Sequence, residues 1–453
     1  MKKQLLLLIF LLLASITSFS QHAILSMRQR AEIEDKLLDI RFQRVIPEIM
    51  RREGIDMWIL ICREYNEDPV LKTMLPATWL SARRRTILIF HDKGEAQGVE
   101  KIAIARYDVG RFFKGAWIPE REPDQFKRLA REIIDRNPKK IALNYSVNYG
   151  HADGITHTEY ELFKNALPAK FHDRIVSAER LAVAWLETRT PEEMMIYRQI
   201  CRIAHEIIEE GLSEKAIHIG ITTSKDVEWW YRERIAELKL DTWFHPSVTI
   251  QRQDGALQKD SNFSTRPDEV TILAGDLVHV DFGITYLGLN TDTQQHLYVL
   301  KPTEKDAPEG LKNALKIANR LQDHLTNNFK TGKTGNEILR DALAQSKAEG
   351  INGTIYTHPI GMHGHAAGPT IGMWDNQGDT KGAGDYPLYP NTAYSIELNA
   401  AVEVPEWNNK LVRIMLEEDG FFDGEKFWYI DGRQTKLWLL PRVEPTNTQK
   451  VNE

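Results

Sequence analysis

The chain has 453 residues, of which 42% are apolar and 27% charged, an ordinary balance for a globular protein. A single hydrophobic core rarely grows beyond roughly 250–300 residues, so we expect more than one domain. The net charge of −6, without a stripe of lysine and arginine, argues against a nucleic-acid partner. The only cysteines are Cys62 and Cys201, which excludes a four-cysteine zinc site, and we expect two buried free thiols.

The first twenty residues have the layout of a cleaved secretory signal. Lys2 and Lys3 follow the initiating methionine, an unbroken apolar run covers residues 5–13, and two serines lie just before Gln21. The apolar run is too short to span a bilayer stably, so we expect an exported protein, periplasmic or secreted, without a stable membrane anchor. An uncleaved anchor is the alternative. We assign residues 1–20 to the signal.

Residues 21–185 are predicted to form a small α/β domain. Short β-rich runs alternate there with helical stretches, and none of the sequence motifs in this part carries chemistry. Packing, and control of access to a site elsewhere, are therefore the expected roles of this domain. The expected helices cover residues 31–52 and 124–135, and the expected strands cover residues 57–62, 86–90, 101–105 and 140–144.

From residue 186 the same order of elements occurs twice. Thr190 and Glu193, on either side of Pro191, form a capping box that begins a helix with one apolar stripe. A second capping box at Thr334 begins another helix. Two helices followed by strands, twice over, indicate two related halves of one domain, residues 186–453. The expected helices are 190–208, 224–238, 311–325 and one from 334, and the expected strands are 277–284, 290–300, 354–358, 393–400, 411–418 and 436–440.

Four of these strands combine an apolar face with a face that bears an acid. In strand 277–284, Val278 and Val280 alternate with His279 and Asp281, and the same pattern places Asp292, Glu397 and Glu417 on the polar faces of three other strands. If the strands form one antiparallel sheet, four carboxylates project from one side and repel each other unless cations neutralise them. Any one of these acids alone would be assigned to an exposed surface. The ordered set favours a metal site, and carboxylates with an imidazole suit Mn²⁺, Zn²⁺, Co²⁺ or Fe²⁺.

A segment rich in histidine and glycine lies between the second and third acids. It reads "HPIGMHGH" from His358 to His365 and follows an expected strand, so we expect a loop that returns toward the sheet. Three histidines in eight residues favour a metal ligand together with proton-transfer partners.

These residues resemble the pita-bread metallopeptidases, the group of Xaa-Pro aminopeptidase, prolidase and methionine aminopeptidase, with the metal-free creatinase as a relative. That family uses five ligands in the order Asp, Asp, His, Glu, Glu, and its aspartates lie eleven positions apart, as in "HVDFGITYLGLNTDTQQ" here. Its histidine segment matches "HPIGMHGH", and its Ile-Glu strand matches "YSIELN". The resemblance covers roughly residues 188–441. It implies an α+β fold, with a pita-bread domain after a smaller α/β domain of the creatinase type.

The resemblance also implies the roles of the matched residues. Two divalent metal ions would bind, with Mn²⁺ the leading candidate and Zn²⁺ or Co²⁺ as alternatives. Asp281 would hold one ion, His358 with Glu397 the other, and Asp292 and Glu417 would bridge them. Glu397 would act as general base, and His365 would donate to the developing oxyanion or orient the substrate. The expected catalytic residues are therefore Glu397, His365 and His358.

Several positions depart from the family pattern. The usual "Val-Arg-Ile-Glu" is replaced by "LVRIMLEEDG", where strand alternation favours Glu417 over Glu418 and a bulge would reverse that choice. Xaa-Pro enzymes usually carry a histidine about seventeen positions before the first aspartate. The stretch "DSNFSTR" lacks it here, and His245 is a candidate replacement. Asp292 is followed by Thr293-Gln294-Gln295 where a Thr-Arg pair is frequent, and Leu398-Asn399 replaces Pro-Gly.

These departures leave three functions to distinguish. The first is a peptidase that acts on peptide N-termini or dipeptides, with Xaa-Pro bonds as the leading target. The second is a hydrolase of a non-peptide, amide-like C–N bond, and the third is a non-catalytic metal-binding protein. The expected partner is thus a peptide or small amide substrate, and a homodimer is a possible assembly.

Overall fold

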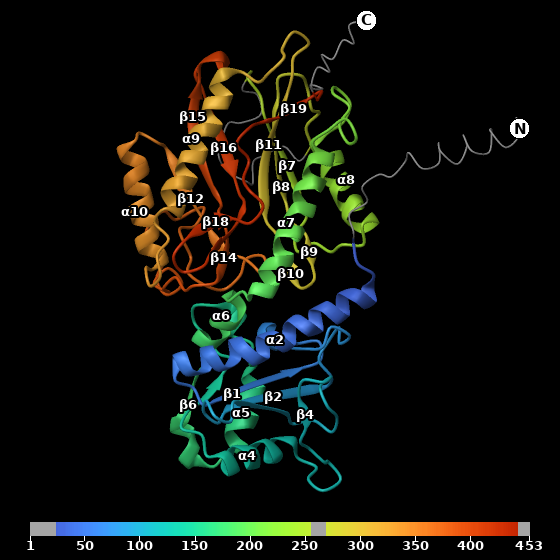
Figure 1. The fold of residues 1–453 in the computed structure, drawn as a ribbon, viewed down its shortest axis with the longest axis vertical. Helices are drawn as coiled ribbons and strands as arrows, with labels where there is room; N and C mark the ends of the chain where they lie inside the picture. Colours follow the sequence, from blue (N-terminus) through green and yellow to red (C-terminus); the bar gives the residue numbers. More distant parts are fainter. Residues whose placement is uncertain (1–23, 255–268, 443–453) are drawn as a thin grey trace, which may run out of the picture.

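The computed structural model describes residues 24–254 and 269–442. In this part of the chain a smaller sheet domain lies at one end and a larger domain at the other, and α6 and α7 connect them (Figure 1). The expected signal, residues 1–20, lies outside the described residues. Among the residues that are described, none of the helices is long and apolar enough to cross a membrane. Cys62 and Cys201 are free and buried, as the sequence predicted.

The N-terminal domain is built on a six-stranded sheet with the order β4-β3-β2-β1-β5-β6. Trp58 and Leu60 of the central strand β1 belong to the core that also contains residues of α2 and α6. Ile59 and Ile61, which point to the opposite face, belong to the core with α4 and α5. Helices therefore cover both faces of the sheet. The elements are α2 (Met27–Glu53), β1 (Met57–Arg63), α3 (Pro69–Lys72), β2 (Arg85–Asp92), β3 (Val99–Ala103), β4 (Lys114–Gly115), α4 (Gln125–Arg136), β5 (Ile141–Leu143), α5 (His157–Ala166), β6 (Ile175–Ser177) and α6 (Glu179–Glu187).

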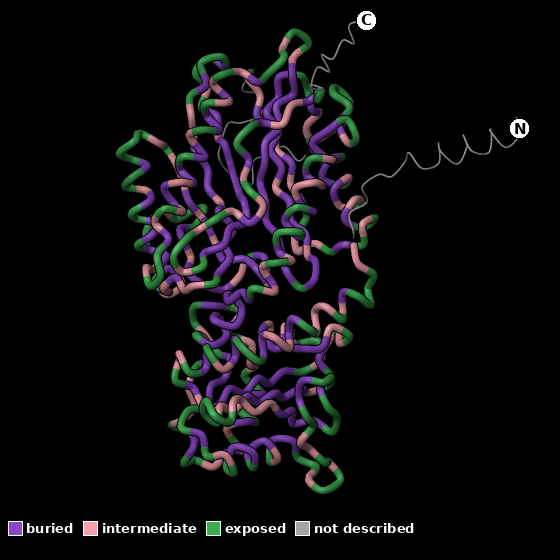
Figure 2. Tube along the Cα trace, in the orientation of Figure 1, coloured by how far each residue is buried: buried purple, intermediate pink, exposed green. Residues whose placement is uncertain are grey.

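The C-terminal domain contains two pairs of helices, and each pair covers its own strands. One core packs α7 and α8 against β8 and β11, and the other packs α9 and α10 against β12, β15 and β16. Buried residues follow the strands between the helix pairs (Figure 2). The repeated order of elements that the sequence indicated is therefore present. The elements are α7 (Pro191–Gly211), α8 (Ser224–Glu237), β7 (Ser247–Gln251), β8 (Leu277–Phe282), β9 (Thr285–Tyr286), β10 (Leu289–Asn290), β11 (Thr293–Val299), α9 (Glu309–Thr326), α10 (Gly335–Ala348), β12 (Gly353–Ile355), β13 (His358–Pro359), β14 (Thr392–Ser395), β15 (Leu398–Val404), β16 (Lys410–Leu416), β17 (Asp419–Phe422), β18 (Phe427–Tyr429) and β19 (Trp438–Leu440).

The strands that carry the acids do not form the single antiparallel sheet considered above. These strands form three larger sheets, β19-β11-β8-β7, β12-β15-β16 and β13-β14-β17-β18. The expected strands 354–358 and 393–400 each divide between two of the sheets, and the expected strand 411–418 ends as β16 at Leu416, before β17 begins at Asp419. At the second break, the Ile396 amide donates to the Glu418 carbonyl (3.0 Å) and the Glu397 amide to Thr357 Oγ1 (3.1 Å). The chain thus changes partners at Glu397 while the apolar–polar alternation continues, so alternation alone does not reveal the break.

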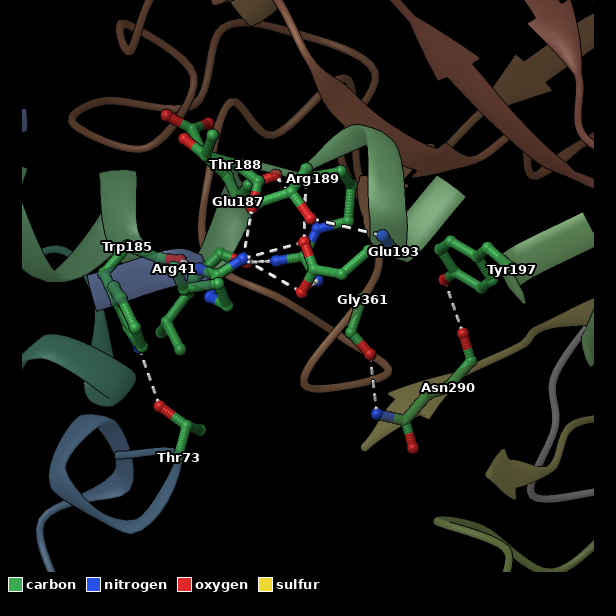
Figure 3. A network of polar contacts seen from close by, with 12 residues as sticks. Arg41, Thr73, Trp185, Glu187, Thr188, Arg189, Glu193, Tyr197, Asn290 and Gly361 are labelled. Atoms are coloured by element: carbon green, nitrogen blue, oxygen red, sulfur yellow. Dashed lines mark hydrogen bonds and ion pairs between the residues drawn. The ribbon is translucent and has the colours of Figure 1, made fainter. Parts of the chain in front are cut away.

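A buried ion-pair network joins the two domains (Figure 3). Arg41 on α2 contacts Glu193 in the first turn of α7 at 3.0 Å and donates to the Thr188 carbonyl at 2.7 Å. Arg189 lies 3.4 Å from the same carboxylate, which also accepts from the Thr190 amide at 2.7 Å in the predicted capping box. Breaking one member would leave buried charge uncompensated, so this network fixes the start of α7 against the N-terminal domain.

Beyond this network, α7 reaches the loops that carry the predicted ligands (Figure 3). The Tyr197 hydroxyl donates to the Asn290 carbonyl at 2.6 Å, and the Asn290 side-chain amide donates to the Gly361 carbonyl at 2.9 Å. Asn290 lies two residues before Asp292, and Gly361 three residues after His358. A single side chain therefore ties the two ligand-bearing segments together.

Candidate metal centre

Five predicted ligands converge where strands of different sheets meet. We call Asp281, Asp292, His358, Glu397 and Glu417 the central cluster. Asp281 lies on β8 and His358 begins β13, whereas the other three lie in the short gaps between β10 and β11, between β14 and β15, and between β16 and β17. Gln294 of β11 pairs with Asp281 in the ladder and forms an isolated bridge with Glu417. The β11 strand therefore brings acids from separate sheets to one place.

The ligand atoms of the cluster form overlapping groups. In each of three groups the candidate atoms lie within 4.8 Å of one another: Asp281, Asp292 and Glu417; His358, Glu397 and Glu417; and Asp292, His358 and His365. His358 Nε2 is 3.5 Å from Glu417 Oε1 and 3.6 Å from Asp292 Oδ2. Asp292, His358 and Glu417 each belong to two groups, and the two carboxylates among them could each contact two neighbouring cations.

The polar atoms at the centre of the cluster suit a bound cation. Asp281 Oδ1, Asp292 Oδ1 and His358 Nε2 are buried, and none of the three has a hydrogen-bond partner among the described residues. His358 Nδ1 lies 2.9 Å from the Pro359 carbonyl, so it carries the proton and leaves the Nε2 lone pair toward the acids. Buried polar atoms are almost always paired, and a divalent cation would pair all three here. The residues present therefore fit a metal ion.

The electrostatics of the cluster point the same way. Burial and the nearby Glu417 raise the pKa of Asp281, Asp292 and Glu397 well above the ordinary range. Burial lowers the pKa of His358, but its close contact with Glu417 and the charges of Glu417 and Glu397 outweigh it, and the net pKa is raised. The raised pKa values of these acids show that their negative charges are poorly compensated by the protein itself, which is what a cation site requires.

The neighbouring glutamates Glu417 and Glu418 face different surroundings. Glu417 accepts from the Ser395 hydroxyl at 2.6 Å and points into the central cluster. Glu418 lies 2.7 Å from His205 Nε2 and accepts from the Gln434 amide at 3.0 Å. His205, Glu418, Asp431 and Arg202 form a second group, which we call the His205 cluster; its remaining contacts are His205 Nδ1 to Asp431 (2.9 Å) and Arg202 Nη2 to Asp431 (2.6 Å).

The histidines of the "HPIGMHGH" segment have separate positions. The exposed His365 ring lies 4.7 Å from the His358 ring and 5.0 Å from Trp243. His363 packs on His151 of the N-terminal domain at 4.6 Å, so it lies at the domain junction. His245 is near Glu228 (3.7 Å) and Trp229 and belongs to none of the three ligand groups. The stretch "DSNFSTR" lies outside the described residues.

Several residues that contact the central cluster belong to none of the motifs recognised in the sequence. The Gln294 amide contacts Glu397 and Glu417, and the Tyr356 hydroxyl hydrogen-bonds Glu397. The Asp419 carboxylate accepts a hydrogen bond from the Cys201 thiol at 3.5 Å and another from the Asp292 backbone amide at 3.4 Å. Strand alternation had already placed Gln294 on the same face as Asp292. No comparable indication in the sequence pointed to Tyr356 or Asp419.

Comparison with known protein families identifies the part of the chain that contains the central cluster. The family model described as metallopeptidase family M24 matches residues 195–420, which contain the whole central cluster. A search of curated proteins found no match.

Solved structures resemble both domains together. An X-Pro aminopeptidase from Thermotoga maritima is 17% identical with a TM-score of 0.60, over 87% of this chain and 100% of that chain. An Xaa-Pro dipeptidase from Bacillus anthracis is 19% identical with a TM-score of 0.56, over 92% and 100%. The prolidase from Pyrococcus horikoshii OT3 is 15% identical with a TM-score of 0.55, over 90% and 99%. At these identities the likeness shows the fold. Together with the family match, it shows that the chain belongs to metallopeptidase family M24 and has the pita-bread fold behind a smaller α/β domain.

Proposed function

We propose that this protein is a hydrolase that depends on two divalent metal ions and cleaves an amide bond at the N-terminus of a peptide or within a dipeptide. The observation that carries the proposal is the central cluster itself. Four carboxyl groups and one imidazole converge there, and three of their buried polar atoms have no partner among the described residues. Acids gathered in this way require cations. We propose Asp281, Asp292, His358, Glu397 and Glu417 as the ligands.

The residues around the cluster suit metal-assisted hydrolysis. Divalent ions bound there would polarise the scissile carbonyl and lower the pKa of the attacking water. Glu397, held by the Tyr356 hydroxyl and grouped with His358 and Glu417, is placed to accept the proton of that water and pass it to the leaving amine. His365 is exposed at the edge of the cluster, where it is placed to hydrogen-bond the substrate carbonyl oxygen.

Xaa-Pro bonds are the leading target within this proposal. The structural relatives are an X-Pro aminopeptidase, an Xaa-Pro dipeptidase and a prolidase by name, and they share the two-domain fold over most of this chain. The family match supports a peptide substrate in general. Mn²⁺ is the ion we propose, with Zn²⁺ or Co²⁺ as alternatives, because the ligand set has carboxylates and imidazole and lacks thiolate.

A non-peptide amide is the second candidate substrate. Gln294 contacts Glu397 directly, in the stretch after Asp292 where a Thr-Arg pair is frequent in the family, and Leu398-Asn399 follows Glu397 where Pro-Gly is frequent. These changes lie beside the proposed general base, so they bear on which substrate fits there.

A substrate panel with and without added metal tests the proposal. The purified chain, loaded with Mn²⁺, Zn²⁺ or Co²⁺, would be assayed on Xaa-Pro dipeptides, longer peptides with proline in second position, dipeptides without proline, and N-acyl amides. We expect release from Xaa-Pro substrates and none from the chelator-treated protein. Cleavage of N-acyl amides alone would favour the second candidate, and failure to bind any of the metals would contradict both.

The variant Asp292→Asn tests whether Asp292 belongs to the site. It keeps the shape of the side chain and removes one charge that two ligand groups share. We expect it to retain the fold, measured by circular dichroism, and to lose turnover. An unchanged rate would remove Asp292 from the site.

We also propose that the protein is exported through residues 1–20, on the strength of the lysines, the apolar run and the small residues found there. Mass spectrometry of the protein recovered from cell fractions tests this. A chain that begins at Gln21 in the exported fraction is the expected result, and a full-length chain confined to the cytoplasm would contradict it.

A further inference from the structure

Gln294 is a neutral side chain placed among the acids of the central cluster. It lies on β11, two residues after Asp292, and is 3% exposed. Its backbone amide donates to the Glu417 carbonyl at 2.9 Å, and Asp281 is its partner in the β8–β11 ladder. The backbone of Gln294 therefore lies beside two proposed ligands. A carboxylate here would add to the repulsion, and an apolar residue would remove the N–H groups that Glu397 and Glu417 share.

The amide nitrogen of Gln294 contacts two carboxylates at once. Nε2 donates to Glu397 Oε1 and to Glu417 Oε2, the latter at 2.7 Å. An amide nitrogen has two N–H groups, one for each acceptor, whereas an ionised carboxylate only accepts. The orientation of the amide is therefore decided by its neighbours. Glu397 and Glu417 each keep a second oxygen, and for Glu417 that oxygen lies 3.5 Å from His358 Nε2.

His279 fixes the opposite end of the amide. Its Nε2 lies 2.9 Å from Gln294 Oε1, and its Nδ1 lies 3.2 Å from the Thr249 hydroxyl. Because Gln294 Oε1 only accepts, Nε2 of His279 must carry the proton, and Nδ1 then accepts from Thr249. The donors thus run in one direction, from Thr249 through His279 and Gln294 to the two acids.

We propose that Gln294, oriented by His279, is a positioning residue that holds Glu397 and Glu417 in the geometry that binds metal. The inference rests on the proposed function and adds a residue that the ligand motif does not contain. Residues that hydrogen-bond metal ligands commonly set ligand orientation, and their loss typically costs about 10–100-fold in metal affinity. Gln294 contacts two ligands through one rigid amide, so both acids should lose their preferred position together when it is removed.

The next residue on the same strand provides a matched control. Gln295 is also buried, but its side chain points to the other face, where Nε2 donates to Glu418 at 3.0 Å and Oε1 accepts from Trp438 Nε1 at 2.8 Å. Replacing either glutamine by methionine keeps the volume and removes the amide. Only Gln294→Met removes donors from the central cluster.

Isothermal titration with Mn²⁺, on the purified full chain stripped of metal, tests the proposal. We expect Gln294→Met to weaken Mn²⁺ binding by about 10–100-fold. Gln295→Met should leave Mn²⁺ binding at the wild-type value, with a lower thermal midpoint as its main effect. His279→Phe, which keeps a ring but loses the donor to Gln294, should weaken binding by about tenfold, the lower end of that range.

The outcomes separate the inference from the function it rests on. If the wild type binds no Mn²⁺, Zn²⁺ or Co²⁺, the proposed function fails before any variant is compared. Equal Mn²⁺ affinity in the wild type and Gln294→Met, or an equal loss in Gln294→Met and Gln295→Met, overturns the positioning role. If Gln294→Met does not fold, His279→Phe decides the matter, because unchanged affinity there also overturns it. Electron paramagnetic resonance of the Mn²⁺-loaded proteins gives a second readout, since displaced acids should alter the signal of coupled ions.

Discussion

Two clusters of buried acids lie on either side of the turn from β16 to β17, and consecutive residues belong to them. Glu417 joins the central cluster and Glu418 joins the His205 cluster, and both are 1% exposed. The His205 cluster contains its own cations, since His205 contacts Glu418 and Asp431, and Arg202 contacts Asp431 with two hydrogen bonds. The central cluster has four carboxyl groups against one imidazole. One cluster is neutralised within the protein and the other is not.

The titration of the two clusters shows the same contrast. Burial raises the pKa of Asp431, but hydrogen bonds from His205 and Arg202 outweigh it and bring the pKa down to about 2. The pKa values of Asp281 and Asp292 are raised instead, by burial and by the nearby charge of Glu417. Acids with internal partners stabilise a fold, whereas acids without them bind cations from solution. The difference therefore separates a structural cluster from the proposed catalytic one.

Glu417→Gln compared with Glu418→Gln should show this difference most strongly. We expect Glu417→Gln to lose metal binding and to lower kcat/KM on the substrate found in the panel by about 10³-fold, which corresponds to roughly 4 kcal/mol of lost transition-state stabilisation. Its metal-free form should be no less stable than the wild type, because a repelling charge is gone. Glu418→Gln should instead keep Mn²⁺ binding and lose stability. Titration with Mn²⁺ and urea unfolding measure both, and the reverse result would exchange the two roles.

The sequence could predict which acids share a face but not where each acid finds its partner. Alternation placed His279, Asp281 and Gln294 on one side of their strands, and the structure brings them together. The strand break at Glu397 was not visible, because the apolar alternation continues through it from Ile396 to Leu398. Likewise, Glu418 meets His205 across a separation of 213 residues. Contacts of that kind depend on how two helix pairs pack over the sheets, and short-range periodicity carries no information about it.

His205→Leu should weaken the neutralised cluster. It would leave Glu418 and Asp431 buried without the imidazolium, and removing one partner of a buried pair costs about 3 kcal/mol or more. Urea unfolding in the presence of chelator measures the change. Arg202→Ala is the control, because Arg202 is mostly exposed and its pair with Asp431 should contribute less than about 1 kcal/mol. Equal losses in the two variants would contradict the assignment of His205 as the central cation.

Added Mn²⁺ should stabilise only the cluster that lacks its own cations. A ligand that binds the folded state at a hundred times its Kd stabilises it by about 2.7 kcal/mol. We expect a rise of this size in the unfolding free energy of the wild type and of His205→Leu, and none in Glu417→Gln. Thermal unfolding with and without Mn²⁺ measures it. A similar rise in Glu417→Gln would place the bound ion outside the central cluster.

The pH dependence of stability should distinguish the clusters even without metal. Burial lowers the pKa of His205, but the charge of Glu418 and the hydrogen bonds to Asp431 and Glu418 outweigh it and raise the pKa to about 10. An unfolded histidine titrates near 6.5, so the stabilisation from His205 is complete below about pH 6.5 and is lost as the pH rises through about 10, by at most about 1.4 kcal/mol per pH unit. The difference in unfolding free energy between the wild type and His205→Leu, measured by urea in chelator, should therefore shrink over this range. A constant difference would mean that His205 stays neutral. The acids of the His205 cluster would then lack the imidazolium charge that distinguishes them from the acids of the central cluster.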